Sequence, residues 1–393
     1  LLFPSFNVGT TLSMHQGNLL SSQGIIRNVE RESLFFGAGA DVRGAGPVAV
    51  PGIILTSHLG DAVFAPQVAR QKVVSSSFDA LATRNQILLQ VANAYLGLAG
   101  AEARVLVLRQ SEGELAEVAR LTSNFALKGQ GREGDAQRAR STLELLHGAQ
   151  IQAEEDVAVQ AADLARLLSS DPAMRLRSEK GMPPLVDLVD MSMPLENLIQ
   201  QALARHPEIA ARSAEVALHE TRLRQERVRP LVPTLAVGLS AGDFGGGGDQ
   251  VGYRFSHFSG RADVDVLAFW TVQNLGFGNL GVQNKVRAEI GQATAQRART
   301  IDRVRREVAQ ALAQATAQRQ QMDIAKKRAA TAQLAFREDL IRARNLQGLL
   351  IEVLDSFNLL ATARQELVST MVAYSQAQFE LYVALGNMPA FGR

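Results

Sequence analysis

The clearest pattern of apolar positions lies near the end of the chain, where apolar residues return every three, four or seven positions. This heptad spacing predicts a helix that packs along one seam against neighbouring helices. Only Arg364 and Gln378 interrupt the seam, and the polar, glycine-containing residues 344–349 predict a turn just before it. The seam consists of Leu350, Val353, Phe357, Leu360, Leu367, Met371, Tyr374, Leu381 and Leu385.

Two long stretches without proline predict two pairs of long helices. Both are rich in helix-forming residues, and each is interrupted only once, by glycine and polar residues. We therefore expect two helical hairpins, each with a tip, whose helices are too long for a compact domain. The predicted hairpins occupy residues 62–171 and 276–393, with helices over 62–127, 134–169, 279–343 and 349–386 and tips near 128–134 and 344–349.

Stretches of alternating apolar and polar residues predict two pairs of β-strands. In the second pair, within residues 230–275, Val264 and Val266 alternate with Asp263 and Asp265, so one face of the strand is apolar and the other is polar. The first pair, within residues 1–61, is predicted to hold a strand over 2–15, a long loop over 16–32 and a return strand over either 33–41 or 48–57.

Proline and glycine are frequent in residues 172–193, which predicts a connector between two halves of the chain. A helix is predicted over residues 194–229. We expect it to break at His206, because the residue before a proline, here Pro207, disfavours the helical conformation.

The two halves of the chain repeat each other. Landmark residues recur at a constant offset of 217 residues, which is the separation of Gly131 and Gly348. The repeating unit is a helix, a strand, a loop, a strand, a long helix, a tip and a second long helix. The helix over 194–229 has no counterpart after Leu1, so we expect roughly thirty residues to be missing from the start. Other aligned landmarks are Arg70 and Arg287, Val91 and Val308, Leu168 and Leu385, and Pro172 and Pro389.

Composition narrows the functional classes. A net charge of +2, from 41 basic and 39 acidic residues, argues against a dedicated nucleic-acid-binding protein. The chain has no cysteine and its six histidines lack ligand spacing, so we expect neither a metal site nor a cofactor. The G-x-S-x-G pattern at residues 238–242 is followed by a glycine loop rather than by the helix of a hydrolase, so no enzyme activity is expected.

The predicted strands decide how the chain could cross a membrane. No apolar stretch approaches the roughly 20 residues of a membrane-spanning helix, so passage through a membrane must use strands. Four strands from one chain cannot close a barrel, and open strand edges are not tolerated in lipid. Several copies must then share one barrel, and cyclic symmetry also gives the long helices neighbours on both sides.

With these features the sequence resembles the TolC family of outer-membrane efflux and secretion channels. The resemblance implies an α+β fold: a homotrimer that forms a shared transmembrane β-barrel of twelve strands, four from each chain, in the outer membrane, and a helical tunnel in the periplasm. It also implies an exit duct that receives substrates from an inner-membrane pump through a periplasmic adaptor protein. The motifs that carry the resemblance are the duplicated unit, His206-Pro207, Leu231-Val232-Pro233, residues 131–140, residues 350–367 and residues 381–385.

The resemblance also implies site residues. Glu352 and Asp355 match an acidic constriction at the tunnel entrance of the family, and Asp135 is the counterpart of Glu352 in the first repeat. A ring of carboxylates attracts cations. The alternative is an ordinary exposed helix whose acids favour the helix dipole. The family often latches this gate with a basic residue near the glycine of the second tip, but here Gly348 has no such neighbour and Arg344 lies one turn earlier.

Docking of the adaptor is implied at the two helical tips, although a glycine there also simply permits a tight turn. An aromatic girdle at the membrane interface is expected at Phe269 and Trp270, which flank a strand end. The rival to the channel is a soluble scaffold of long coiled coils, which would have no use for two amphipathic strand pairs. The tip residues are Lys128, Gly129, Gly131, Asn345, Leu346 and Gly348.

Overall fold

The chain divides into two units in a computed structural model. The strand-bearing unit comprises Leu1–Ser77 and Ala210–Ala298, and the helical unit comprises Phe78–Ile209 and Arg299–Arg393. The structure describes residues 6–21, 23–39, 53–171, 173–179, 181–244, 259–345 and 347–388.

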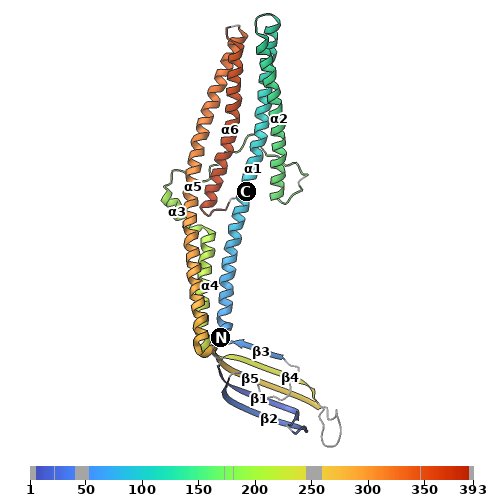
Figure 1. The fold of residues 1–393 in the computed structure, drawn as a ribbon, viewed down its shortest axis with the longest axis vertical. Helices are drawn as coiled ribbons and strands as arrows, with labels where there is room; N and C mark the ends of the chain where they lie inside the picture. Colours follow the sequence, from blue (N-terminus) through green and yellow to red (C-terminus); the bar gives the residue numbers. More distant parts are fainter. Residues whose placement is uncertain are drawn as a thin grey trace. The chain divides into compact units, whose positions relative to one another are not determined.

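The strand-bearing unit contains one antiparallel sheet with the strand order β2-β1-β5-β4-β3 (Figure 1). Strands from the two halves of the sequence alternate with one another, because β1 pairs with β5 and β3 pairs with β4. The strands are β1 (Phe6–Leu20), β2 (Ile26–Gly39), β3 (Ile53–His58), β4 (Thr234–Phe244) and β5 (Ser259–Val272).

Two predictions for the first strand pair are wrong. Residues 16–32 are not a long loop, because β1 and β2 pair along their whole lengths, from Asn7 opposite Gly39 to Leu20 opposite Ile26. Polar residues and glycine still supply backbone N–H and C=O groups to the ladder, so a strand forms there without apolar alternation. Over the described ranges the sheet also has five strands where four were predicted.

Both stretches proposed for the return strand contribute to the sheet. Residues 33–39 belong to β2, and residues 53–57 belong to β3, which pairs with β4 instead of with β1. The remaining residues of both stretches lie outside the part of the chain that the structure describes.

Six helices account for most of the residues that the structure describes. The four long ones begin and end within three residues of the predicted bounds, and the break between α3 and α4 falls at His206. Short 3₁₀ helices, Arg229–Leu231 and Gln273–Gly276, adjoin β4 and β5. The helices are α1 (Leu59–Leu127), α2 (Glu133–Leu167), α3 (Leu195–Arg205), α4 (Pro207–Val228), α5 (Phe277–Arg344) and α6 (Leu350–Ala384).

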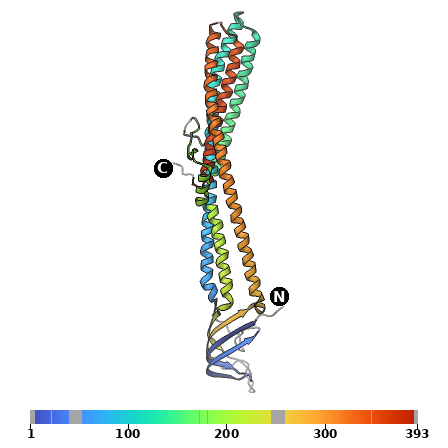
Figure 2. The same ribbon diagram turned by 90° about the vertical axis from the view of Figure 1, so that its left-hand side faces the viewer.

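In the helical unit the hairpin of α1 and α2 lies beside the hairpin of α5 and α6 (Figures 1 and 2). The heptad seam of α6 lines the contact, and Val353, Phe357 and Leu360 are each 1% exposed. The ring of Phe357 meets that of Phe336 on α5 edge-on, with the ring centres 5.8 Å apart. The prediction that this seam packs against neighbouring helices is therefore confirmed.

The second interruption of the seam binds the connector. Gln378 is fully buried, and its side-chain oxygen accepts hydrogen bonds from the N–H groups of Leu188 at 3.1 Å and Val189 at 3.2 Å. One turn earlier, the Tyr374 hydroxyl donates to the carboxylate of Asp187. Burial, followed by this contact with Asp187, raises the pKa of Tyr374 to about 12. The connector is thus fastened to α6 by polar groups that a purely apolar seam would lack.

The prediction that no apolar stretch approaches the length of a membrane-spanning helix needs correction. Helix α1 contains a window of 18 residues with a mean hydropathy of 1.3, which is long and apolar enough to cross a membrane by composition alone. More than half of that window, 56%, is buried inside the protein, as in the core helix of a water-soluble bundle.

Candidate functional site at the two helical tips

The tips of the two hairpins share one backbone geometry. In the first tip the N–H of Gln130 donates to the carbonyl oxygen of Phe125 at 2.9 Å, and in the second the N–H of Gln347 donates to that of Arg342, also at 2.9 Å. Both pairs are separated by the 217-residue offset of the predicted repeat. The first backbone hydrogen bond of the following helix matches as well. The N–H of Asp135 donates to the carbonyl oxygen of Arg132, and the N–H of Glu352 donates to that of Leu349.

The tip glycines are positions of close approach. A Cβ atom on Gly131 would lie 3.0 Å from the Cβ of Phe125, and one on Gly348 would lie 3.2 Å from the Cβ of Arg342. Gly129 adopts a positive φ of 70°, which glycine tolerates better than other residues. Sequence and backbone therefore agree on why glycine occupies the tips.

Glu352 and Asp355 lie together on the exposed side of α6, immediately after the second tip. The carboxylate of Glu352 accepts a hydrogen bond from the N–H of Leu349 at 3.2 Å, which satisfies one of the unpaired groups at the start of the helix. Asp355 makes no ion pair within the described part of the chain. Since Val353 and Phe357 fill the core side, the two acids face away from the rest of the chain.

Asp135 at the first tip differs from these two acids. Its carboxylate pairs with Arg138 at 3.1 Å, and the Asp135 side chain is only 14% exposed. In the repeat Arg138 corresponds to Asp355, so one tip carries an acid with its own cation while the other carries two acids. The three predicted gate residues therefore do not share one environment.

Two ion pairs join the hairpins behind the second tip. Arg364 of α6 binds the carboxylate of Glu114 of α1 with nitrogen–oxygen distances of 2.7 and 3.0 Å, and Arg344 of α5 binds Glu117 of α1. The Arg364 side chain is 12% exposed and that of Glu114 is 24% exposed. The sequence pointed to Arg364 only as an interruption of the seam, and nothing in it identified Glu114 or Glu117 as partners.

Each tip also presents an exposed leucine. Leu127 is 85% exposed and Leu349 is 65% exposed. Among the predicted docking residues, Lys128, Gly129 and Asn345 are exposed. Leu346 lies outside the described residues.

The predicted girdle residues lie at the end of β5 that adjoins α5. Trp270 is 38% exposed, and its indole N–H donates to the carbonyl oxygen of Leu231 at 3.3 Å. Neighbouring residues of a strand point to opposite faces, so Trp270 shares a face with Val266 while Phe269 shares the face of Asp265.

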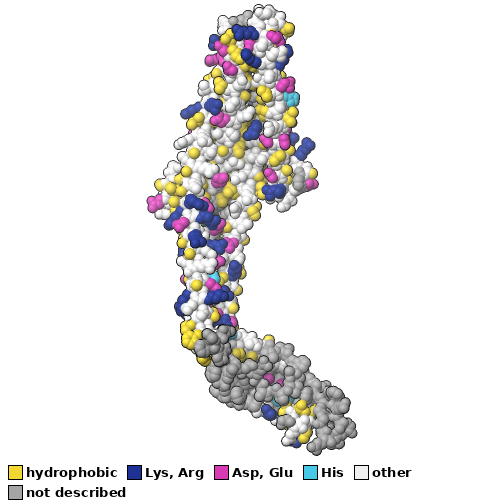
Figure 3. All heavy atoms as spheres, viewed as in Figure 1, with side chains coloured by type: hydrophobic (Ala, Val, Ile, Leu, Met, Phe, Trp, Pro, Cys, Tyr) yellow, Lys and Arg dark blue, Asp and Glu magenta, His cyan; other side chains and the backbone are white. Residues whose placement is uncertain are grey.

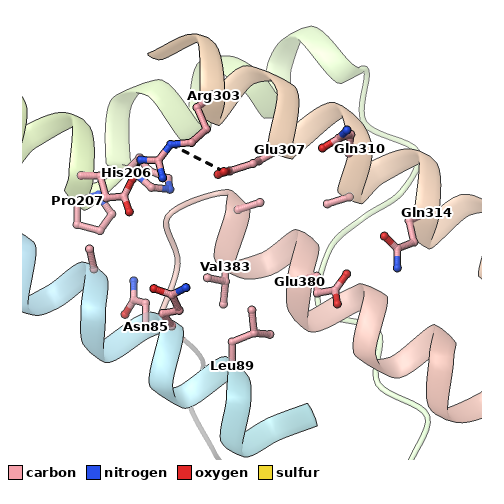
Figure 4. Close-up of a pocket in the computed structure, with 15 residues that line it drawn as sticks. Asn85, Leu89, His206, Pro207, Arg303, Glu307, Gln310, Gln314, Glu380 and Val383 are labelled. Atoms are coloured by element: carbon pink, nitrogen blue, oxygen red, sulfur yellow. Dashed lines mark hydrogen bonds and ion pairs between the residues drawn. The ribbon is translucent and has the colours of Figure 1, made fainter. Parts of the chain in front are cut away.

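A cavity of about 380 Å³ in the helical unit lies between α1, α5, α6 and the α3–α4 break (Figure 4). Burial raises the pKa of the Glu380 carboxyl and of the Glu307 carboxyl, and it lowers the pKa of His206. Arg303 forms ion pairs with Glu208 and, at 3.9 Å, with Glu307. Charged side chains of both signs are interspersed over the helical unit on the face in Figure 3.

No protein-family model and no curated protein sequence matches the chain. Solved structures do. The outer-membrane channel OprN superimposes with a TM-score of 0.69 at 16% identity, covering 97% of this chain and 81% of that one. The outer membrane protein VceC from Vibrio cholerae gives 0.68 at 15% identity, covering 97% and 87%.

The CmeC outer membrane channel of Campylobacter jejuni gives a TM-score of 0.67 at 14% identity, covering 98% of this chain and 78% of that one. These likenesses extend over both units and nearly every described element. The chain therefore has the fold of outer-membrane channel proteins, and its resemblance to the TolC family is confirmed at the level of the fold.

Proposed function

We propose that the chain is one subunit of a trimeric outer-membrane channel, an exit duct without enzyme activity that lies in the outer membrane with its helical tunnel in the periplasm. The observation that carries the proposal is the fold it shares, along 97% of its length, with the outer-membrane channel OprN. The properties of its own sheet and tips support the same function.

The sheet supports a barrel shared between copies. Its end strands, β2 and β3, have no further partner among the described residues, and such edges are not stable in lipid. On β1 and β5 one face exposes apolar side chains, since Met14, Val264 and Val266 are 41%, 37% and 40% exposed, while β2 adds Glu30 and Glu32 to the same face. A soluble scaffold would present this face to water, whereas a membrane barrel turns it to lipid. Trp270 lies on the apolar face, so the proposed girdle keeps Trp270 rather than Phe269.

The matching tip hydrogen bonds support an origin of the two hairpins by duplication. The same offset relates their ends, where Leu168 donates to the carbonyl oxygen of Leu164 at 3.0 Å and Leu385 to that of Leu381 at 3.1 Å. Two equivalent hairpins in each of three chains give a ring of six, which is a suitable wall for a tunnel.

Glu352 and Asp355 are the proposed acidic constriction. In a ring of three chains their exposed carboxylates gather around one axis, which favours cations and hinders anions. Asp135 contributes less to this field, because Arg138 already compensates its charge. On the alternative reading these acids only stabilise the start of α6, and that reading accounts for Glu352 but not for Asp355.

The ion pairs of Arg364 with Glu114 and of Arg344 with Glu117 are the proposed latch. Each joins the second hairpin to α1 of the first, so the tip region cannot widen within one chain until these contacts break. The exposed Leu127 and the tip residues around it offer an apolar contact to a periplasmic adaptor, which would connect the duct to an inner-membrane pump.

The experiment is the reversal potential of the channel in a planar bilayer under a gradient of potassium chloride. Wild type is compared with Glu352→Gln/Asp355→Gln, and Asp135→Asn serves as the matched control. We expect a loss of cation preference in the double variant and little change in the control. Equal selectivity of wild type and double variant in open channels would rule out the constriction.

A further inference from the structure

The cavity in the helical unit is not explained by the tips or by the proposed latch. Its wall comes from α1, α5, α6 and the residues around the α3–α4 break, and all of its lining residues belong to the helical unit (Figure 4). Its volume of about 380 Å³ lies at the lower end of the range of pockets that bind small molecules. The chemistry of the wall then decides which class of molecule fits.

The charged side chains of the wall leave two negative charges without a counter-charge. Three carboxylates, those of Glu208, Glu307 and Glu380, line the cavity together with one guanidinium, that of Arg303. Arg303 pairs with Glu208 and lies 3.9 Å from Glu307, so the two acids share its charge. Glu380 makes no ion pair within the described part of the chain. His206 does not compensate either, because burial lowers its pKa and keeps the imidazole neutral near pH 7.

These uncompensated carboxylates are partly removed from water. Burial raises the pKa of the Glu307 carboxyl and of the Glu380 carboxyl above the ordinary 4.5, because a charge loses its hydration there. A cation bound in the cavity would supply the missing counter-charge and stabilise the ionised form of both groups. The wall is therefore suited to a positively charged ligand.

Asn85 of α1 gives an observation that is independent of charge. It is 3% exposed, and its side-chain Oδ1 is buried without a hydrogen-bond partner among the described residues. Figure 4 shows the Asn85 side chain pointing from α1 into the cavity. A buried amide oxygen without a donor is uncommon in proteins and costs free energy. The cavity thus offers a free acceptor to a ligand that carries N–H groups.

We propose that this cavity binds a small organic dication of the class of short aliphatic diamines. Its ammonium groups donate hydrogen bonds to the carboxylates on α5 and α6 and to the amide oxygen of Asn85, and its methylene groups contact Leu89 and Val383. A neutral molecule would leave the two negative charges uncompensated, and an anion would add to them. A bare metal ion fits less well, since no three His, Asp or Glu side chains converge as ligands among the described residues.

The proposed site goes beyond the channel function and does not depend on it. All of its lining residues lie within the helical unit, and binding can be measured without any current through a membrane. Failure of the channel in a bilayer would leave the site intact, and failure of binding would leave the channel intact.

The test is isothermal titration calorimetry of the full-length protein in detergent at about pH 8, where amines carry a proton and carboxylates do not. The probes are the four-carbon diamine putrescine, butylamine with one amino group, the uncharged butanediol of the same chain length, and magnesium chloride. We expect saturable binding of putrescine below about 1 mM and binding of the other three that is at least about tenfold weaker. Absence of saturable putrescine binding, or equal binding of butanediol or Mg²⁺, would overturn the proposal.

Three variants then locate the binding site. Glu380→Gln should weaken putrescine binding by about tenfold or more, because it removes a charged partner of the ligand, and Asn85→Ala should weaken it by about threefold to tenfold. Glu155→Gln removes an exposed acid of α2 and should bind as wild type does. Glu380→Gln removes an unpaired buried charge and should not destabilise the fold, so its loss of binding would not come from unfolding. Unchanged affinity in Glu380→Gln, or an equal loss in Glu155→Gln, would contradict binding in this cavity.

Discussion

Arg364 of α6 holds the carboxylate of Glu114 of α1 through two contacts of 2.7 and 3.0 Å, although 250 residues separate the two in sequence. The guanidinium also contacts the side-chain oxygen of Gln333 on α5. A planar guanidinium that binds both oxygens of a carboxylate is a strong and directional contact. This pair connects the two hairpins at a position where the apolar seam is interrupted.

Arg364→Ala should lower the free energy of unfolding of the helical bundle by about 2 kcal/mol, because the partly buried carboxylate of Glu114 loses both hydrogen bonds from Arg364 and keeps only the one from Gln110. The matched control is Arg328→Ala. Arg328 pairs with Glu366 within the second hairpin, and both side chains are over 40% exposed, so we expect a loss of less than about 1 kcal/mol. Chemical denaturation of the two variants measures the difference, and equal losses would contradict the role given to Arg364.

Gln378→Leu should loosen the connector. The substitution keeps the size of the side chain but leaves the N–H groups of Leu188 and Val189 without an acceptor, at a cost of about 2 kcal/mol. Compared with wild type, amide hydrogen exchange should accelerate in residues 184–191 of the variant and stay unchanged in the tips. Gln376→Leu is the control, because Gln376 makes a single contact with the carbonyl oxygen of Asn93 at 3.3 Å. Unchanged exchange in the connector of Gln378→Leu would count against this fastening.

The ends of the two hairpins predict opposite effects of substitution. Gly386 has φ +80°, and a Cβ there would lie 2.9 Å from backbone atoms of His206. Gly386→Ala should therefore destabilise by about 3 kcal/mol through strain and overlap. Its counterpart Ser169 is exposed and has φ +53°, so Ser169→Gly should stabilise by about 1 kcal/mol. Thermal unfolding compares them, and a loss in both variants would contradict the equivalence of the two ends.

Stability should depend on pH through Glu380. Burial raises the pKa of its carboxyl above the ordinary 4.5. The folded state then binds the proton more tightly than the unfolded state, so this contribution to stability is present below the ordinary pKa and is lost as the pH rises through the raised one. Glu380→Gln should therefore raise the melting temperature at neutral pH, with no difference below about pH 4.

Glu155→Gln is the control for that comparison, because Glu155 is exposed on α2. It should leave the melting temperature nearly unchanged at both pH values. A gain in Glu380→Gln that persists undiminished in acid would show that something other than the carboxylate charge causes it.

The helices were readable from sequence because their signals are local. Proline-free stretches, tip glycines and the heptad seam each act over a few residues, so the predicted helix bounds lie within three residues of those in the structure. The first half of β2, residues 26–32, was missed for the opposite reason. Its residues, such as Arg27, Glu30 and Arg31, resemble a surface loop, and only the backbone partners supplied by β1 make them a strand.

In the candidate site, too, local features could be predicted from the sequence and contacts between distant residues could not. The positions of Glu352 and Asp355 after a glycine tip could be inferred from the repeat, since the pattern is local and occurs twice. The partners of Arg364 and Gln378 could not, because Glu114 and the connector are far away in sequence. Both residues were visible only as polar interruptions of an apolar seam, and both turn out to make the polar contacts that hold separate segments together.

The most direct test of the channel is the single-channel current of purified trimers in a planar bilayer. Wild type, Arg344→Ala/Arg364→Ala and the control Arg328→Ala are compared at the same protein density. We predict that the double variant opens more often and conducts more current than wild type, while the control behaves as wild type. Trimers of the double variant that insert into the bilayer, remain folded and never conduct would contradict the account.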